Sequence, residues 1–520
     1  MKTMRKYVII IASFMFLTSC VQDLGSYADR SAADLIPRIT STLEEAYIAI
    51  ILEYFSITPE IDGDPANYEF LWHVFPHPLT TQNQRDTIGR EKNLNYRVTL
   101  AEGMYRLIFE VRCRETGVTA FQYSILNVTS EFGEGFFILT YENGRTDMDF
   151  ITRNGVVSSN IFATINGQGL LGRPIRASLT SQFVPPGGTW ATMIAVSSDE
   201  DLQIFYGSDM RLFRGWDDLF MLTPEVRRPQ GVWGTGTGFV LLNNGLLHHL
   251  RGAMGSPALF GHNLPDEGFN LTSGRAAVVG STLAFFNENT GSIVGYAPGT
   301  HRFAYTEVTQ AVLAQLPGND QHHFTNQELL WLGNQHNFAA STPRGWALLK
   351  SNNPNEVGRV RLLDMMMGSW AGFSSLIYNG HTVVPDGFLV GEGTVFAAQN
   401  GHLLPGNRGD LIYFSTGDNR VHIYNHVNQT QALNVITLPT DETVVDMQHY
   451  FSLVNLLPTA ILPENALFVL SNRPSGWVLR IFGMLGATAN VDESNLIATF
   501  EGTGEATQVM IREVFTTRTW

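Results

Sequence analysis

The chain has very few cysteines, only Cys20 and Cys113 in 520 residues. If Cys20 is modified, as its surroundings indicate below, Cys113 has no partner and no intramolecular disulfide can form. Stability must then come from packing. Cys113 ends an every-second-residue apolar set that starts at Tyr105, so we predict a buried small side chain and not a reactive thiol.

Charged residues are also scarce, at 16% of the chain compared with about 25% in typical soluble domains. The net charge is −15, and no basic stripe is present that could neutralise phosphates. We therefore exclude nucleic acid as a partner. Low charge together with 49 glycines and 33 phenylalanines is typical of a turn-rich β protein, and the length allows more than one domain.

Long apolar runs are missing, and the longest one lies near the N-terminus. A basic start, Met1–Lys6, precedes an apolar run, Tyr7–Leu17, that is shorter than the roughly 20 residues of a membrane-spanning helix. This order predicts a signal peptide over residues 1–19. The sequence Leu17-Thr18-Ser19-Cys20 resembles the bacterial lipobox, which implies that Cys20 carries the lipid. The alternative is an ordinary secretory signal with an incidental cysteine.

The residues after Cys20 indicate where the anchor places the protein. Acyl chains attach the chain to a membrane while the rest stays in water. No aspartate follows Cys20 directly, and by resemblance to bacterial sorting rules this favours the outer membrane, with the cell surface preferred over the periplasmic face. Residues 20–45 are predicted to form a lipidated linker.

Residues 46–130 show the pattern of a small β-sandwich. Alternation with period two is clearest at Tyr96–Leu100 and Tyr105–Cys113, and five or six strands in about 90 residues is the size of an immunoglobulin-like domain. The further strands are predicted at Ile48–Ile57, Glu69–Phe75 and Phe121–Val128. Trp72 should pack inside the sandwich. Short helices are expected at Leu43–Tyr47 and Gln310–Leu316.

Residues 131–520 repeat a different pattern, in which short apolar runs alternate with Gly, Asn or Asp turns every 40 to 70 residues, the scale of propeller blades. Seven runs open these repeats: Phe136–Leu139, Met193–Val196, Phe239–Leu242, Ala277–Gly280, Leu329–Leu332, Val395–Ala398 and Leu467–Leu470. Closure into a ring protects the many strand edges. We predict an all-β protein whose second part is a propeller of six to eight blades; several sandwiches are the alternative.

The N-terminal part resembles the PKD-like lipoproteins of Bacteroidetes-type bacteria over roughly residues 17–151. After the lipobox, the matching segments include Asp23–Tyr27, Ser56–Pro59, Tyr68–Trp72, Asn93–Tyr96, Gly103–Tyr105, Gly135–Leu139 and Asp149–Ile151. Two departures are Val111–Arg114, where the family has valine-x-aspartate, and Gly135-Phe136, where glycine-tryptophan is usual. The resemblance implies an outer-membrane lipoprotein associated with SusC/SusD-type nutrient uptake and implies no enzymatic activity.

Candidates for metal binding are weak. Adjacent histidines on a strand point to opposite faces, so neither His248-His249 nor His322-His323 forms a site by itself. Asp62-Gly63-Asp64 and Asp199-Glu200-Asp201 lack the continuation of an EF-hand and are interpreted as turns. We predict no metal, no cofactor and no catalytic residue.

Tryptophans beside glycines are the best binding candidates: Trp216, Trp233 and Trp370. An exposed indole offers a flat apolar face to a sugar ring or a partner's side chain; packing in the core is the alternative for each. The leading hypothesis is a non-catalytic binding lipoprotein for a glycan, peptide or partner protein. A polysaccharide hydrolase or lyase on a propeller, and a purely structural subunit of an uptake complex, are the alternatives.

The lipid anchor gives a direct test. Replacing Cys20 by Ala (Cys20→Ala) should abolish incorporation of radiolabelled fatty acid, because the thiol that accepts the lipid is lost. Cys113→Ala serves as the control and should leave labelling unchanged. Label that persists in Cys20→Ala contradicts the lipobox assignment.

Overall fold

The computed structural model describes most of the chain. The described residues are 36–77, 85–100, 102–152, 154–188, 190–261, 271, 275–279, 282–289, 291–298, 302–305, 307–308, 326–335, 344–370, 373–400, 410–451, 465–484, 491 and 493–512. The chain divides into two compact units, Met1–Thr129 and Ser130–Trp520. This division lies one residue from the boundary that the sequence predicts. In the described residues no helix has the length and apolar character needed to cross a membrane.

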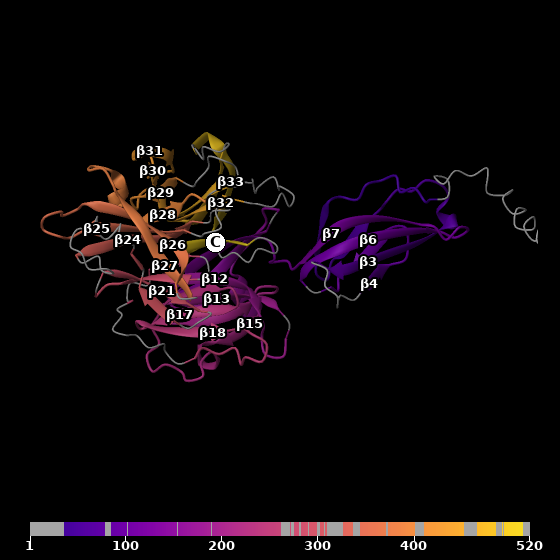
Figure 1. Ribbon diagram of the computed structural model, residues 1–520, viewed down its shortest axis with the longest axis horizontal. Coiled ribbons are helices and arrows are strands. Elements are labelled where there is room, and N and C mark those ends of the chain that lie inside the picture. Colours follow the sequence, from indigo (N-terminus) through magenta and orange to yellow (C-terminus); the bar gives the residue numbers. More distant parts are fainter. Residues whose placement is uncertain are drawn as a thin grey trace, which may run out of the picture. The chain divides into compact units, whose positions relative to one another are not determined.

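The first unit is a β-sandwich (Figure 1). Its five-stranded sheet has the order β1-β7-β6-β3-β4, and β2 pairs with β5. The strands are β1 (Ala46–Ile50), β2 (Tyr54–Ile57), β3 (Tyr68–Pro76), β4 (Asp86–Gly89), β5 (Leu94–Arg97), β6 (Gly103–Cys113) and β7 (Thr119–Thr129). Trp72 is fully buried and stacks on Phe109 with ring centroids 4.3 Å apart, which confirms its predicted place in the core.

Three predictions for this unit need correction. Leu43–Tyr47 is not a helix, because β1 begins at Ala46 and pairs in parallel with β7. The predicted strand Ile48–Ile57 is two strands, since a turn at residues 51–53 reverses the chain. Cys113 is only partly buried, since β6 ends there and the chain turns through residues 114–116.

The second unit consists of seven sheets in the described residues, and each of the seven predicted runs falls in a different sheet. Sheet 1 is β36 (Glu505–Arg512), β8 (Gly135–Glu142), β9 (Arg145–Thr152) and β10 (Val157–Ser158), with β11 (Leu170–Leu171) beside β9. Sheet 2 is β12 (Pro174–Phe183), β13 (Ala191–Ser198), β14 (Leu202–Tyr206) and β15 (Leu212–Gly215). Sheet 3 is β16 (Pro229–Thr235), β17 (Gly238–Asn243) and β18 (Leu246–Arg251).

The chain continues through the remaining four sheets in order. Sheet 4 is β19 (Ala276–Val279), β20 (Thr282–Asn287), β21 (Ser292–Ala297) and β22 (Arg302–Tyr305). Sheet 5 is β24 (Gln327–Gln335), β25 (Arg344–Ser351), β26 (Val360–Trp370) and β27 (Phe373–Val383), with β23 (Glu307–Val308) beside β27. Sheet 6 is β28 (Val395–Ala398), β29 (Leu411–Ser415), β30 (Arg420–Asn425) and β31 (Thr430–Thr437). Sheet 7 is β32 (Thr443–Phe451), β33 (Asn465–Arg473), β34 (Gly476–Gly483) and β35 (Leu496–Gly502).

Helical elements in the described part are short. They are α2 (Ile161–Asn166), η2 (Pro65–Asn67), η3 (Trp216–Asp218), η4 (Leu389–Glu392) and η6 (Glu493–Asn495). The expected helix Gln310–Leu316 lies outside the described residues. The fold is therefore all-β, as predicted.

Apolar clusters between successive sheets arrange the seven sheets as a ring. Each of seven buried clusters draws its side chains mainly from two neighbouring sheets: 1 and 2, 2 and 3, 3 and 4, 4 and 5, 5 and 6, 6 and 7, and 7 and 1. In β13, for example, Ile194 and Val196 face sheet 1 while Met193 and Ala195 face sheet 3. Sheets buried on both faces explain why the sequence shows continuous apolar runs rather than alternation.

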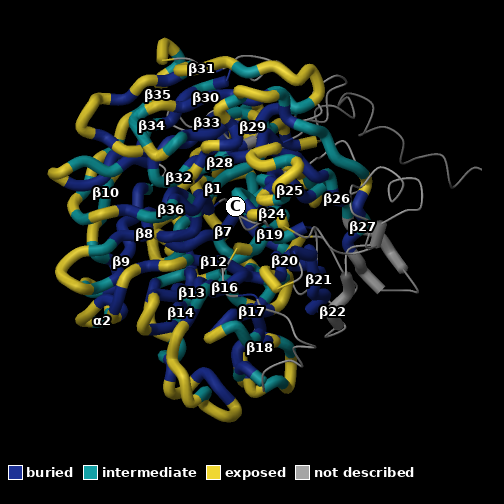
Figure 2. The backbone as a smooth tube through the Cα atoms, turned by 90° about the vertical axis from the view of Figure 1, so that its left-hand side faces the viewer, coloured by how far each residue is buried: buried dark blue, intermediate teal, exposed yellow. Residues whose placement is uncertain are grey.

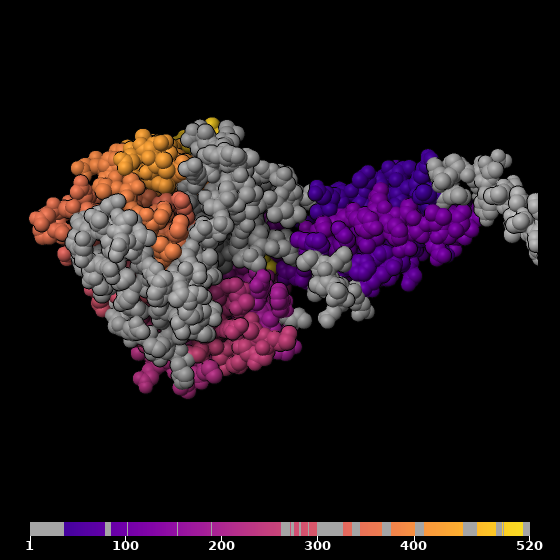
Figure 3. All heavy atoms as spheres, in the orientation of Figure 1, coloured from indigo at the N-terminus to yellow at the C-terminus, as the bar shows by residue number. Residues whose placement is uncertain are grey.

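The ring is a seven-bladed propeller, within the predicted range of six to eight blades. The innermost strand of each sheet lies near the middle of the ring, and the other strands of the sheet lie toward the rim (Figure 2). The innermost strands of sheets 1 to 7 are β36, β12, β16, β19, β24, β28 and β32. Residues of this unit follow one another round its visible face in sequence order (Figure 3). The C-terminal β36 pairs with β8, so both ends of the repeat region share sheet 1.

The junction of sheets 7 and 1 gives a stability test. Phe468 of β33 is fully buried and its ring lies 5.1 Å from that of Phe136. Phe468→Ala should lower the free energy of unfolding by about 3–5 kcal/mol, because a buried aromatic is replaced by a cavity. Leu433→Ala, at a 44% exposed position of β31, should change it by less than about 0.5 kcal/mol. Urea unfolding of the second unit measures both; equal effects would contradict the closed junction.

Candidate binding site

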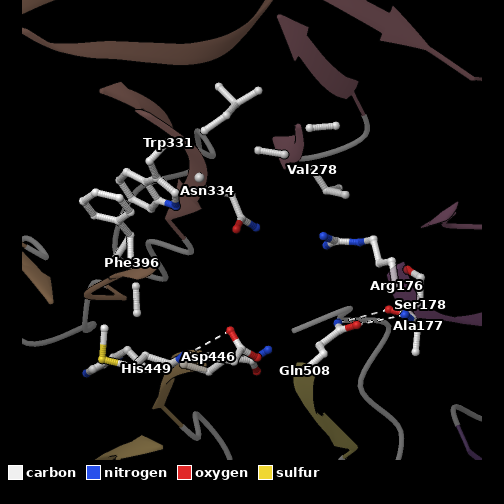
Figure 4. Close-up of a pocket in the computed structure, with 18 of the residues that line it drawn as sticks. Arg176, Ala177, Ser178, Val278, Trp331, Asn334, Phe396, Asp446, His449 and Gln508 are labelled. Atoms are coloured by element: carbon white, nitrogen blue, oxygen red, sulfur yellow. Dashed lines mark hydrogen bonds between the residues drawn. The ribbon is translucent and has the colours of Figure 1, made fainter. Parts of the chain in front are cut away.

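A cavity of about 290 Å³ lies where the innermost strands of the propeller meet. Its walls come from six of the seven sheets, through β12, β19, β24, β28, β32 and β36. Radial packing of the sheets brings these strands together, so residues more than 300 positions apart, such as Arg176 and Gln508, line one space (Figure 4). We call this space the channel cavity.

One wall of the channel cavity is aromatic. Trp331 of β24 and Phe396 of β28 are partly buried and stack, with ring centroids 5.5 Å apart and planes 23° apart. Two glycines make room for them: a Cβ on Gly333 would lie 2.0 Å from Cζ2 of Trp331, and one on Gly393 would lie 2.4 Å from Cζ of Phe396. Side chains at these two positions would displace the rings, so the glycines shape the wall.

Arg176 of β12 extends into the channel cavity from the opposite side (Figure 4). Its guanidinium forms no hydrogen bond or ion pair with any described residue, and its Nε is buried. The guanidinium lies over the ring of Trp233, whose centroid is 5.7 Å from Cζ of Arg176. Burial lowers the pKa of Arg176, but a guanidinium stays charged throughout the physiological range. The cavity therefore holds a cation without a hydrogen-bond or ion-pair partner among the described residues.

Asp446 of β32 reaches the cavity from below in Figure 4. Its Oδ1 accepts a hydrogen bond from the backbone N–H of Met447 at 2.9 Å, and its Oδ2 accepts one from Val509 at 2.8 Å. Burial raises the pKa of Asp446 to about 7, because it disfavours the charged form more than these two hydrogen bonds and the charge of Arg176 favour it. The carboxyl group is thus partly protonated at neutral pH.

His449, also on β32, is a neutral group of the cavity. Its Nδ1 accepts a hydrogen bond from the backbone N–H of Asn400 at 3.1 Å, which places the ring proton on Nε2. Burial lowers the pKa of His449 to about 3. The imidazole therefore stays uncharged at physiological pH.

Amide side chains complete the walls. The side-chain amide of Gln508 forms two hydrogen bonds with the backbone of Ala177: its Oε1 accepts from the N–H at 2.8 Å, and its Nε2 donates to the carbonyl at 3.1 Å. These hydrogen bonds connect β36 to β12. Gln448 donates from Nε2 to the carbonyl of Val509, whereas its Oε1 has no partner among the described residues. Asn334 points toward the middle of the cavity (Figure 4). The polar groups thus surround a space that faces an aromatic wall.

The tryptophans predicted to bind a ligand lie elsewhere. Trp216 is 3% exposed and packs on Phe220 in the cluster between sheets 2 and 3, and Trp233 is fully buried between sheets 3 and 4. Neither offers an exposed face, so the packing alternative holds for both. Trp370 ends β26, and its side chain lies outside the described residues, as does Cys20.

The other candidate residues from the sequence that are described take part in side-chain packing or in turns. His248 packs against Phe220 and His249 against Tyr296. Asp64 accepts a hydrogen bond from the N–H of Ala66 at the start of η2, and Asp199–Asp201 form the connection between β13 and β14, as the turn interpretation predicts. His322-His323 lies outside the described residues. Across the described part of the chain, no group of three or more His, Cys, Asp or Glu side chains is placed to hold a metal.

The residues of the channel cavity were not among the candidates from the sequence. The signal that could have found them is a charged or amide side chain within the innermost strand of a sheet, as at Arg176, Asp446 and Gln508. That signal requires the strand order inside each blade, which the degenerate repeats do not show.

Comparisons with known proteins bear on the two units differently. Residues 20–174 match the model of the PKD-like family, which confirms the resemblance of the N-terminal part. A search of curated proteins finds no match to the chain.

Several solved structures resemble the chain at low identity. One is a quinonprotein alcohol dehydrogenase-like protein from Bacteroides thetaiotaomicron, at 11% identity and a TM-score of 0.39, covering 92% of this chain and 99% of that one. Another is apo AztD from Citrobacter koseri, at 10% identity and a TM-score of 0.37, covering 85% and 97%. A third is the dihydro-heme d1 dehydrogenase NirN, at 10% identity and a TM-score of 0.33, covering 92% and 81%. The propeller assignment comes from the seven sheets and their shared clusters.

The pKa of Asp446 predicts a pH effect on stability. A carboxyl group whose pKa is raised by folding stabilises the folded state below its unfolded pKa, and this contribution is lost as pH rises to about 7. Relative to Asp446→Asn, the wild type should lose about 1.4 kcal/mol of stability per pH unit between about pH 4 and 7, and nothing further above that. Urea unfolding at pH 4, 5.5, 7 and 8 measures the difference. A difference that is constant with pH contradicts the raised pKa.

Proposed function

We propose that this protein is a lipid-anchored lipoprotein of the outer membrane whose propeller binds a small polar ligand without transforming it. The observation that carries the proposal is the channel cavity, in which the aromatic wall of Trp331 and Phe396 faces the guanidinium of Arg176. Concave sites that combine apolar surface with a few placed polar groups are typical of small-molecule binding. The match of residues 20–174 to the PKD-like family supports an accessory role for the first unit.

The wider role follows from the same proposal. A lipid on Cys20 would hold the protein at the outer membrane, and the ligand would be a glycan or a peptide collected for a SusC/SusD-type uptake system. The cavity volume, about 290 Å³, is near the lower end of the range of roughly 300–1,000 Å³ for small-molecule sites. It suits a small molecule, or one end of a chain, better than a folded partner.

One feature of the cavity favours binding over glycoside hydrolysis. Glycoside hydrolysis normally uses two carboxyl groups, and Asp446 is the single carboxyl group among the described residues of the lining. Retention of a ligand without turnover is therefore the function that these groups support best.

Affinity electrophoresis of the mature protein, residues 20–520, in gels containing glycans tests this function. The wild type should be retarded by at least one glycan without releasing reducing ends over time. Trp331→Ala should weaken the retardation about tenfold or more, because an aromatic contact at the centre of a site is worth ~2 kcal/mol. Trp190→Ala, at an indole that is 69% exposed, is the matched control and should behave as wild type.

Each alternative has its own result. Reducing ends that accumulate with time would establish a hydrolase or lyase in place of a binding protein. No retardation by glycans or peptides, together with co-purification of a porin-like partner, would establish a structural subunit.

A further inference from the structure

We propose that the channel cavity is a site for a sugar acid, such as the terminal uronic acid residue of a glycan, and that Arg176 binds its carboxylate. This inference rests on the proposed binding function and names the chemical class of the ligand. It follows from the charge, the shape and the polar groups of the cavity.

The charge of the cavity points to an anion. Two other arginines that are largely shielded from solvent in the propeller have polar partners: Arg480 forms a two-pronged ion pair with Glu442, at 2.5 and 2.8 Å, and Arg512 donates to the carbonyl of Phe132 at 2.8 Å. The partly buried Arg176 has no hydrogen-bond or ion-pair partner among the described residues and contacts only the ring of Trp233. A charge shielded from water without an ionic partner costs free energy, which an incoming carboxylate with its two oxygens would offset.

No described residue supplies an ionic partner for Arg176. Asp446 raises the pKa of Arg176 through its charge, yet the two side chains form no ion pair. Each oxygen of Asp446 accepts one backbone hydrogen bond, from the N–H of Met447 and from that of Val509. Arg176 is the single cationic side chain among the described residues of the lining. A single carboxylate on the ligand would therefore be enough to pair with the cationic side chain of the cavity.

The wall opposite Arg176 indicates that the carboxylate belongs to a ring. A pyranose has an apolar C–H face that packs on an aromatic ring, and Trp331 with Phe396 presents such a surface. Hydroxyl groups on the rim of the sugar need donors and acceptors. Asn334 points into the space between the wall and Arg176 and offers both a donor and an acceptor, and Asp446 reaches the same space.

Asp446 gives the site a pH dependence of defined sign. Among the described residues of the lining the charged or titratable groups are Arg176 on β12 and Asp446 and His449 on β32; β19, β24, β28 and β36 contribute none. A charged Asp446 repels a carboxylate, whereas a protonated one can donate a hydrogen bond to it. Because the pKa of Asp446 is about 7, a sugar acid should bind more tightly at pH 6 than at pH 8.

Isothermal titration calorimetry of the mature protein with methyl glucuronide and methyl glucoside tests the inference. These probes differ in the carboxylate alone. The wild type should bind methyl glucuronide at least tenfold more tightly, and the preference should be larger at pH 6 than at pH 8. Arg176→Gln should abolish the preference, and Asp446→Asn should abolish its pH dependence.

Arg173→Gln is the matched control, because it removes one positive charge from an exposed arginine that pairs with Glu505 outside the cavity. It should bind as wild type. If Arg176→Gln fails to fold, the preference of the wild type between the two probes and its pH dependence still decide the question.

Three outcomes overturn the inference and differ in what they say of the proposed function. Equal binding of the two probes, or an unchanged preference in Arg176→Gln, removes the sugar-acid assignment while the binding function stands. Binding of a peptide through its C-terminal carboxylate, without binding of methyl glucuronide, replaces the ligand class. Binding of neither probe, together with no retardation in any glycan gel, removes the assignment and the proposed function alike.

Discussion

The pairing of β36 with β8 is the interaction on which the second unit depends. Each sheet of the propeller is apolar on both faces, so each needs a neighbour on either side. Six of the seven junctions join sheets that follow one another in the chain. The seventh requires the last strand of the second unit to return to the first one, and β36 does this by pairing with seven residues of β8. Packing at that junction includes the hydrogen bond from Nε1 of Trp477 to Asp149, at 2.8 Å.

Closure has a chemical consequence at the centre of the ring. The innermost strands of the sheets converge there, and the side chains that they direct toward the centre cannot all be covered by another sheet. Polar groups can therefore remain in the channel cavity that would be costly in the packed interior of a blade, where the buried Glu442 has both Arg480 and Ser471 as partners. Arg176 and Asp446 differ from such a pair because they are left with bonding capacity toward the cavity. The same architecture that packs the junctions with apolar side chains thus leaves charged and polar side chains at the channel cavity in its centre.

Much of this fold can be predicted from the sequence because its signal is local. Continuous apolar runs such as Met193–Val196 mark strands that are buried on both faces, and alternation such as Tyr105–Cys113 marks the sandwich. The helix expected at Leu43–Tyr47 was wrong because pairing with β7 outweighs the local preference of that short segment. Partial exposure of Cys113 has a related cause, since its strand ends there and alternation no longer specifies burial.

The site could not be predicted to the same extent, for a physical reason. Glycines beside tryptophans were interpreted as exposed turns, but a Cβ on Gly231 would lie 2.5 Å from the ring of Trp233, so that glycine admits the indole to the core. Gly333 makes room in the same way for Trp331, but that indole is only partly buried and lines the cavity wall. That distinction depends on contacts among six sheets, which no local pattern contains.

We propose that the ligand lies at the centre of the propeller, between the aromatic wall and Arg176. A crystal structure of the mature protein grown with a uronic acid-terminated oligosaccharide tests it most directly. We expect density for the terminal sugar against Trp331, with its carboxylate on the guanidinium of Arg176. Density for the sugar on the outer surface of the blades or on the first unit, with none in the channel cavity, would contradict the claim.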